Sequence, residues 1–252
     1  MSTDPVAAPC CPLARHLGKI TTVAVLALAA IIAVNSLRAD DKERPEAEQA
    51  AASQPPQGAV LLFDGKDLSK WQKPDGGPAP WKVENGYMEV RGGDIITKDK
   101  FRDCRIHIEF MPPDMGPQAK GQARGNSGVY VMNAYEIQVL DSYGLPKLEM
   151  GDCASIYSKK IPDKNAAKPP GQWQTYDMEF KAPKFDASGK KVANGRITIV
   201  WNGQKVHDNV EIDGPCPGGA PETPQGGAIR LQDHGNPVRF RNIWVVPGDA
   251  KQ

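Results

Sequence analysis

The sequence predicts an all-β domain, a sandwich of two antiparallel sheets, and three observations carry this prediction. Runs of alternating apolar and polar residues recur at spacings of roughly 8–12 residues, which is typical of sandwich strands. Asn-Gly, the strongest short hairpin signal, stands between two such runs at Asn85-Gly86 and again at Asn202-Gly203. Glycine (25) and proline (23) are frequent, and the domain contains no segment of useful length with the period of a helix.

The first part of the chain has a different character. Arg15, His16 and Lys19 precede an apolar run, residues 20–34, which is shorter than the roughly 20 residues of a membrane-spanning helix and suits a signal peptide. We expect residues 1–39 to be either a cleaved signal peptide or a retained N-terminal membrane anchor. Both alternatives place the domain outside the cytoplasm, as an exported protein that is periplasmic, secreted or held on the outer face of the cytoplasmic membrane.

A change of composition separates this segment from the domain. Residues 40–57 are rich in Ala, Glu, Gln and Pro, and Ala is almost their only apolar residue. Such a segment cannot bury enough apolar surface to fold, so we expect a disordered linker. Residues 58–250, roughly 190 in number, suffice for one domain with a hydrophobic core. The formal net charge of +1 leaves no strongly basic surface, so nucleic acid is not an expected partner.

The expected strands of the domain follow in chain order. Arg105, His107 and Glu109 alternate with apolar residues in one of them, and we expect these three on a solvated outer face. Two long polar loops, 111–125 and 158–172, are candidates for functional segments because loops of this length are uncommon without a function. The expected strands are 59–63, 81–84, 87–90, 104–110, 127–132, 135–140, 173–181, 197–201, 204–206, 228–232 and 238–246.

Two of these strands place polar side chains together on one face. Residues two apart in a strand share a face, so Glu136 and Gln138 point away from the apolar residues that flank them. The same alternation puts Arg230, Gln232 and His234 on one face of a later strand and its extension. These side chains are either ordinary solvent-facing residues or the floor of a binding cleft.

Six short motifs follow one another along residues 59–247. They are LLFDGKDL (61–68), WKVENG (81–86), NSGVY (126–130), YEIQVLD (135–141), IRLQDHG (229–235) and VRFRNI (238–243). In this order the motifs resemble the 3-keto-disaccharide hydrolase domain family, which is abundant in exported bacterial proteins. The resemblance implies a concanavalin A-like jelly roll whose concave sheet forms a cleft for a carbohydrate substrate.

The chain departs from the jelly-roll glucanases of the laminarinase type in one respect. Those enzymes carry Glu-x-Asp-x-x-Glu on a concave strand, and the matching positions here are Glu136, Gln138 and Asp141. A glutamine replaces the middle acid, and a regular strand puts Asp141 on the opposite face from Glu136 and about 16 Å away. The two carboxyl groups at about 5–5.5 Å that a retaining glycosidase needs are therefore not expected.

The family resemblance implies a different reaction. A ketone at C3 of the sugar acidifies the hydrogen on C2, so a single base can form an enolate that expels the C1 substituent, after which water adds back. We expect Glu136 to be the base and His234 to polarise the ketone or carry a proton. The residues expected to bind substrate are Gln138, Asn126, Arg230, Gln232, Arg241 and Asp141.

Three questions stay open at this level. A divalent metal held by Glu136, Asp141 and His234 is one possible cofactor, although no cluster has a diagnostic ligand spacing. The three cysteines of the domain allow one disulfide and one buried thiol in an exported protein. The alternative function is a non-catalytic carbohydrate-binding jelly roll, because lectins share this architecture.

Overall fold

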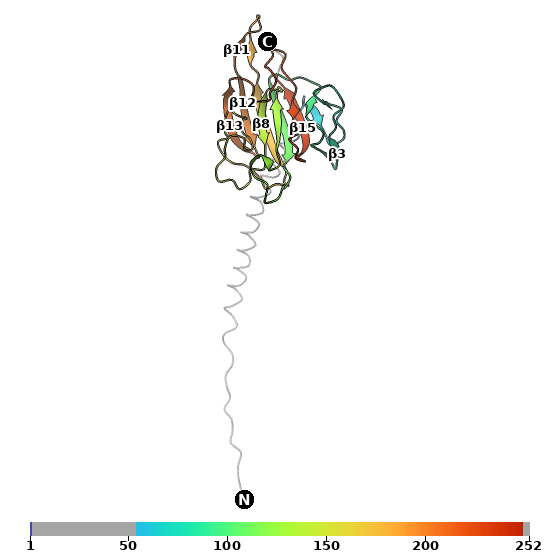
Figure 1. Ribbon diagram of the computed structural model, residues 1–252, viewed down its shortest axis with the longest axis vertical. Coiled ribbons are helices and arrows are strands. Elements are labelled where there is room, and N and C mark those ends of the chain that lie inside the picture. The colour runs from blue at the N-terminus through green and yellow to red at the C-terminus, as the bar shows by residue number, and fades with distance from the viewer. Residues whose placement is uncertain (2–53, 249–252) are drawn as a thin grey trace. The chain divides into compact units, whose positions relative to one another are not determined.

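The computed structural model describes residue 1 and residues 54–248, and within them the fold is all-β (Figure 1). The one helical element in these residues is a single 3-10 turn, η1 (Gly121–Ala123). The predicted sandwich of two antiparallel sheets is confirmed. The predicted targeting segment, 1–39, and most of the predicted linker, 40–57, lie outside the described residues. Within the described part, no helix has the length and hydropathy needed to span a membrane.

The larger sheet has eight strands in the order β13-β12-β9-β6-β15-β4-β3, and β1 also pairs with β15. Every pairing in it is antiparallel. The bounds of its strands are β1 (Val60–Phe63), β3 (Lys82–Glu84), β4 (Tyr87–Glu89), β6 (Cys104–Met111), β9 (Gln174–Lys181), β12 (Gly195–Trp201), β13 (Gln204–Ile212) and β15 (Arg239–Pro247).

The smaller sheet has five strands in the order β2-β5-β14-β7-β8. A separate hairpin joins β10 to β11. The bounds of these strands are β2 (Trp71–Gln72), β5 (Ile95–Thr97), β7 (Ser127–Val131), β8 (Tyr135–Val139), β14 (Arg230–Leu231), β10 (Lys184–Phe185) and β11 (Lys191–Ala193). The four strands β2, β5, β10 and β11 were not predicted, because two or three residues are too few to show an alternating pattern.

Both predicted Asn-Gly hairpins are present. Asn85 and Gly86 have positive φ angles of 48° and 78°, and Asn202 and Gly203 have 49° and 76°. Positive φ at both central residues defines the turn whose twist matches that of the two strands it joins, and asparagine and glycine tolerate it best. The sequence therefore determines these two strand pairings locally.

One hydrophobic core lies between the two sheets. The ring of Tyr135 in β8 packs 5.4 Å from that of Phe180 in β9, measured between ring centroids. The hydroxyl of Tyr176, also in β9, crosses the core to donate a 2.7 Å hydrogen bond to the Gln138 carbonyl. These contacts fix the position of β8 relative to the larger sheet.

The free edge of β8 is covered by the chain that follows it. The N–H of Gln138 donates to the carbonyl of Ser155, the N–H of Ala154 donates back to Gln138, and the N–H of Tyr157 donates to Glu136. These three bonds satisfy the backbone of an edge strand that would otherwise be open to a second chain. Residues 154–157, which directly precede the predicted loop 158–172, thus help to hold β8 in place.

The three cysteines of the domain are buried and free. No disulfide joins Cys104, Cys153 and Cys216, so the alternative of one disulfide and one thiol is corrected. Burial raises the pKa of the Cys104 and Cys153 thiols to about 12 and that of Cys216 to about 11. Thiols with such pKa values stay protonated at neutral pH and are inert.

Candidate active site

Six polar or small residues, from three adjacent strands and the position directly after β14, line one face of the smaller sheet. Register pairs Glu136 of β8 with Tyr130 of β7, and Tyr130 with Arg230 of β14. One step along the sheet, Gln138 pairs with Gly128, whose carbonyl accepts a 2.9 Å hydrogen bond from the N–H of Gln232. The apolar residues between them are fully buried in the core, so this face is turned away from the core, as the alternation predicted.

Glu136 lies at the centre of this face and is only 3% exposed. Its Oε2 accepts a 2.8 Å hydrogen bond from the hydroxyl of Tyr130. Burial raises the pKa of its carboxyl, and the Tyr130 hydrogen bond and the charges of Arg230 and His234 oppose this rise. No Lys or Arg forms a salt bridge with Glu136 within the described residues. A desolvated carboxylate without a direct ion pair is a stronger base than one in water.

Gly128 provides the space beside Glu136. A Cβ on residue 128 would lie 2.6 Å from Oε1 of Glu136 and 3.2 Å from Oε1 of Gln232. Side chains do not approach this closely, so a residue larger than glycine would displace the carboxyl group. The NSGVY segment thus carries a glycine where the Glu136 carboxylate packs closely against the backbone.

Tyr130 and Arg230 hold the other side of Glu136. The guanidinium carbon of Arg230 lies 3.6 Å from the centroid of the Tyr130 ring, and its Nη2 donates a 2.8 Å hydrogen bond to the Gly218 carbonyl. Nε of Arg230 is 3.6 Å from Oδ2 of Asp94. Burial and the neighbouring Glu136 raise the pKa of Tyr130 well above its ordinary value, so its hydroxyl keeps its proton. The face therefore presents one base, one neutral hydroxyl and one fixed positive charge.

A relay of side-chain amides borders the opposite end of the face. Nε2 of Gln122 donates to the Gly151 carbonyl at 2.9 Å. Its Oε1 accepts from Nδ2 of Asn126 at 2.9 Å and from Nε2 of Gln138 at 2.8 Å. The predicted residues Asn126 and Gln138 are thus brought together by Gln122, a residue of the predicted functional loop 111–125.

His234 lies beside this face, on the exposed loop that follows β14. The charge of its imidazole contributes to the pKa of Glu136, so the two groups are near enough to interact electrostatically. The loop is held by the neighbouring Asp233, whose carboxylate accepts from the Gly93 N–H at 2.8 Å and whose own N–H donates to Asp94. His234 therefore lies on an anchored loop two residues beyond Gln232, and its role in the site stays a prediction.

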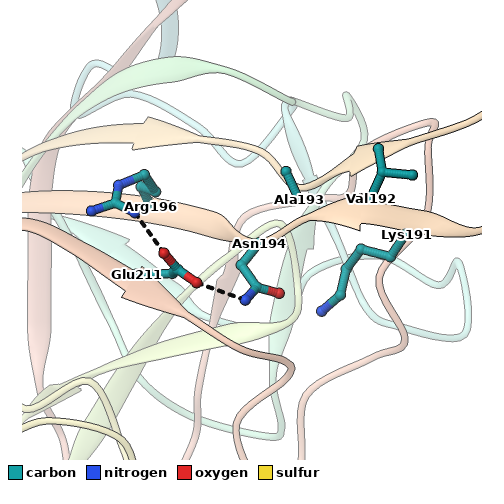
Figure 2. A pocket seen from close by; sticks show the side chains of 6 residues that line it. All are labelled: Lys191, Val192, Ala193, Asn194, Arg196 and Glu211. Carbon is teal, nitrogen blue, oxygen red and sulfur yellow. Dashed lines mark hydrogen bonds and ion pairs between the residues drawn. The ribbon is translucent and has the colours of Figure 1, made fainter.

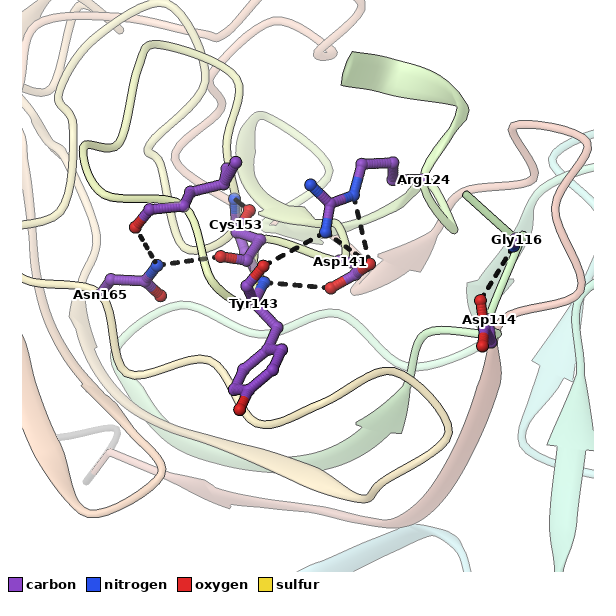
Figure 3. A network of polar contacts seen from close by, with 9 residues as sticks. Asp114, Gly116, Arg124, Asp141, Tyr143, Cys153 and Asn165 are labelled. Atoms are coloured by element: carbon purple, nitrogen blue, oxygen red, sulfur yellow. Dashed lines mark hydrogen bonds and ion pairs between the residues drawn. The ribbon is translucent and has the colours of Figure 1, made fainter. Parts of the chain in front are cut away.

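Asp141, predicted to bind substrate, instead holds loops together (Figure 3). Its Oδ2 accepts from Nη2 and Nε of Arg124 at 2.8 and 3.2 Å, and its Oδ1 accepts from the Tyr143 N–H at 3.0 Å. Nearby, Asn165 donates to the carbonyl of Ser142 at 2.9 Å. With its oxygens used in this way, the Asp141 carboxylate has a structural role.

Arg241 was also predicted to bind substrate, and the structure places it elsewhere. It belongs to β15 of the larger sheet, where its Nε donates to Oε2 of Glu109 at 2.6 Å and its guanidinium lies 4.1 Å from the centroid of a Trp173 ring. His107, expected on a solvated face, is 1% exposed and pairs with Asp177 at 2.6 Å. Alternation identified the face of each strand but could not show which sheet the strand joins.

No metal centre is apparent in the part of the chain that the structure describes. Within it, no three or more His, Cys, Asp and Glu side chains are grouped so that they could hold an ion, and Glu136, Asp141 and His234 do not form such a group. A hollow near β11 and β12 is separate from the predicted residues (Figure 2). Arg196 and Asn194, which line it, both bond to Glu211 at 2.7 and 2.9 Å.

Sequence reasoning missed part of this site. Gln122 carries no signal in its own segment, because its role depends on contacts with distant strands. Tyr130 and Gly128 entered the sequence analysis only as members of the NSGVY motif, without a role of their own. A strand glycine flanked by buried residues is a signal of close approach that was available in NSGVY.

Comparison with known proteins agrees with the fold. Residues 58–246 match the family described as the 3-keto-alpha-glucoside-1,2-lyase-like domain. A 3-keto-disaccharide hydrolase of Bacteroides thetaiotaomicron is 26% identical over 240 residues, which cover 75% of this chain and 78% of that protein.

Two solved structures, both from Parabacteroides distasonis and both provisionally named glycosyl hydrolases, have the same fold. The first has a TM-score of 0.70 at 40% identity and covers 77% of this chain and 85% of its own. The second has a TM-score of 0.57 at 22% identity, covers 80% and 97%, and supports the fold alone. The family match spans most of the chain, and this chain therefore belongs to the 3-keto-alpha-glucoside-1,2-lyase-like domain family.

Proposed function

We propose that this chain is an exported enzyme that cleaves the glycosidic bond of 3-keto-glycosides, 3-keto-disaccharides in particular. Family membership and the related hydrolase support an enzyme of the glycoside-cleaving type. The positively charged residues and apolar run before residue 35 support export. The observation that carries the proposal is the carboxylate of Glu136, which is buried, has one oxygen held by Tyr130 and has the other close against the backbone of Gly128.

Glu136 takes the proton from C2 of the keto-sugar in this proposal. The electron pair of the C2–H bond forms the C2–C3 double bond of an enolate, and the charge moves to the former ketone oxygen. The enolate oxygen then re-forms the ketone, the C2–C3 electron pair becomes a C1–C2 double bond, and the C1 oxygen substituent leaves with a proton. Water adds to C1 and a proton returns to C2. The raised pKa of Glu136 suits it to this task, because a stronger base shifts the first step forward.

The developing negative charge needs a positive or hydrogen-bonding group. Arg230 and His234 are groups near Glu136 that can carry a positive charge, and both act on its carboxylate electrostatically. The Arg230 side chain is held by Tyr130 and Gly218, so it offers a fixed charge that needs little reorganisation during the reaction. His234 is exposed and can exchange protons with solvent. We assign charge stabilisation to Arg230 and proton transfer at the ketone or leaving group to His234.

A pair of substrates tests the reaction class. The purified protein is incubated with a 3-keto-disaccharide and with the unoxidised parent disaccharide, each with and without a chelator, and released sugars are quantified. We expect release from the ketone alone, because only the ketone makes the C2 hydrogen acidic. Cleavage of the parent alone would exclude the elimination mechanism. Binding of either sugar with no release would favour the carbohydrate-binding module.

A further inference from the structure

We propose that the amide oxygens of Gln232 and Gln138 accept hydrogen bonds from sugar hydroxyls, and that Gln232 binds the hydroxyl on C2, the carbon that loses its proton. This inference rests on the proposed function and deepens it. It makes a free 2-hydroxyl group part of the substrate that the enzyme selects. The argument comes from two buried amide oxygens for which the protein supplies no donor.

The orientation of the Gln138 amide follows from a chain of contacts. A backbone carbonyl can only accept, so Gln122 must turn its NH₂ group toward Gly151. Its Oε1 then faces Gln138, whose NH₂ group must therefore be the donor of the 2.8 Å hydrogen bond between the two side chains. The Oε1 of Gln138 is consequently left without a partner, and the side chain is 1% exposed. The carbonyl of one loop residue thus decides which atom of Gln138 is available.

The orientation of Gln232 is decided in the same way from the other side. Tyr130 donates its proton to Glu136, so its oxygen can only accept from Gln232. Nε2 of Gln232 lies 3.5 Å from that oxygen. Its Oε1 then points the other way and has no partner in the protein.

The free oxygens of Glu136 and Gln232 both lie close to Gly128. Oε1 of Glu136 and Oε1 of Gln232 both lie within 3.2 Å of the point that a Cβ of residue 128 would occupy, and Gln138 is the cross-strand partner of this glycine. The hydroxyl group on C2 is attached to the same carbon as the hydrogen that Glu136 removes, so it lies beside the Glu136 oxygen when that hydrogen faces it. Gln232 is the acceptor beside that position, so it is the group that meets the hydroxyl of the reacting carbon.

A cation is a poorer match for the same oxygens than a hydroxyl group. The carboxylate beside these amide oxygens is that of Glu136, and the guanidinium of Arg230 already acts on its charge. A divalent ion would be repelled by Arg230 and would have a single negative ligand. Hydroxyl groups donate to carboxylate and amide oxygens without adding charge. A buried acceptor without a partner is costly, so a hydrogen bond from a sugar hydroxyl to it stabilises the complex.

The test compares a 3-keto-disaccharide with its 2-deoxy analogue, both of which keep a removable proton on C2. The measured quantity is the ratio of the two kcat/KM values, because this ratio does not depend on the fraction of folded enzyme. We expect wild type to prefer the 2-hydroxy substrate and Gln232→Leu to lose about tenfold of that preference. Gln232→Glu keeps an acceptor oxygen and should retain the preference even where its overall rate falls. Gln72→Leu, in β2 at the opposite edge of the sheet, is the matched control and should leave the ratio unchanged.

The outcomes separate this inference from the function on which it rests. Turnover by wild type with the same ratio in Gln232→Leu would overturn the role of Gln232 while leaving the reaction class intact. A preference that disappears with a chelator would also overturn it, because an ion would then occupy these oxygens. No turnover of either ketone by wild type would remove the proposed function, and this inference with it.

Discussion

Two buried glutamates, one on the outward face of each sheet, have opposite electrostatic environments. Glu136 has a raised pKa because burial outweighs one tyrosine hydrogen bond and distant charges. Glu109 in β6 is 7% exposed, yet hydrogen bonds from Asn242 and Arg241, together with His107 at 3.7 Å, outweigh its burial and hold its pKa at about 2. The difference lies in the partners, since both carboxylates are buried.

The comparison separates a structural cluster from a candidate active site. Around Glu109, Arg241 bonds at 2.6 Å and Asn242 at 2.8 Å, so both carboxylate oxygens are used. Around Glu136, two amide oxygens have no partner and one carboxylate oxygen lies close against Gly128. A fully paired cluster stabilises the fold, whereas polar groups left unpaired cost stability and are retained where a ligand completes them.

The largest effect is expected from removing the proposed base. Glu136→Gln keeps the shape of the side chain and its acceptor for Tyr130, but it cannot take a proton. We expect kcat on a 3-keto-disaccharide to fall about 10²- to 10⁴-fold, with Tm unchanged or raised. Steady-state kinetics and thermal unfolding measure the two. A variant that binds the sugar and keeps most of its turnover would remove Glu136 from the mechanism and the contrast with Glu109.

A smaller loss of activity is expected from adding a side chain at Gly128. Gly128→Ala places a Cβ 2.6 Å from the Glu136 carboxylate, which must move. Displacement of a catalytic group by about 1 Å costs on the order of 100-fold in kcat/KM. Gly214→Ala is the matched control, because a Cβ there meets no atom within 4 Å. Equal activity of the two variants would show that turnover does not depend on the position of the Glu136 carboxylate beside Gly128.

Next in size is the loss of stability from the paired cluster. Glu109→Gln removes the charge that Arg241 faces at 2.6 Å and that His107 faces at 3.7 Å. We expect the free energy of unfolding to fall by about 2 kcal/mol, while kcat of the folded enzyme stays the same. Denaturant unfolding gives the first value and kinetics the second. A fall in kcat without loss of stability would reverse the assignment of the two glutamates.

The smallest effect is a difference in pH dependence. The folded pKa of Glu109 is about 2 against an ordinary 4.5, so its stabilisation is full above about pH 4.5 and is lost as the pH falls toward 2. Glu136 has a raised folded pKa, so its contribution is present at low pH and is lost as the pH rises above about 4.5 through that pKa. Lowering the pH from about 6 to 3 should therefore bring the stability of Glu109→Gln closer to that of wild type. The same change should make wild type more stable relative to Glu136→Gln. If the stability differences of both variants from wild type changed in the same direction with pH, the opposite pKa shifts of Glu109 and Glu136 would be contradicted.

Several parts of the fold and the site could be read from local patterns. Alternation placed Glu136 and Gln138 on one face of their strand. It also placed Arg230 and Gln232 on one face of a later strand, because the side chains of a strand alternate whatever the surroundings. Asn85-Gly86 and Asn202-Gly203 defined two hairpins through their positive φ angles. These features depend on a few neighbouring residues, so tertiary contacts did not change them.

Other parts depended on which strands become neighbours. Arg241 shares the polar character of Arg230, but its strand belongs to the larger sheet and its partner is Glu109. Asp141 continues the motif that begins at Glu136, yet Arg124 takes its carboxylate. His107 was expected in solvent and is buried against the ring of Trp244, with ring centroids 5.1 Å apart.

The sequence by itself determined which residues lie on the outward faces of their strands and where two of the hairpins turn, because both follow from backbone geometry over a few residues. Only the tertiary structure decided that Glu136 has one oxygen bonded to Tyr130 and the other close against Gly128, while Glu109 has both oxygens paired. The reason is that a carboxylate's pKa depends on how many donors converge on it from other strands, and that convergence arises when distant segments pack together.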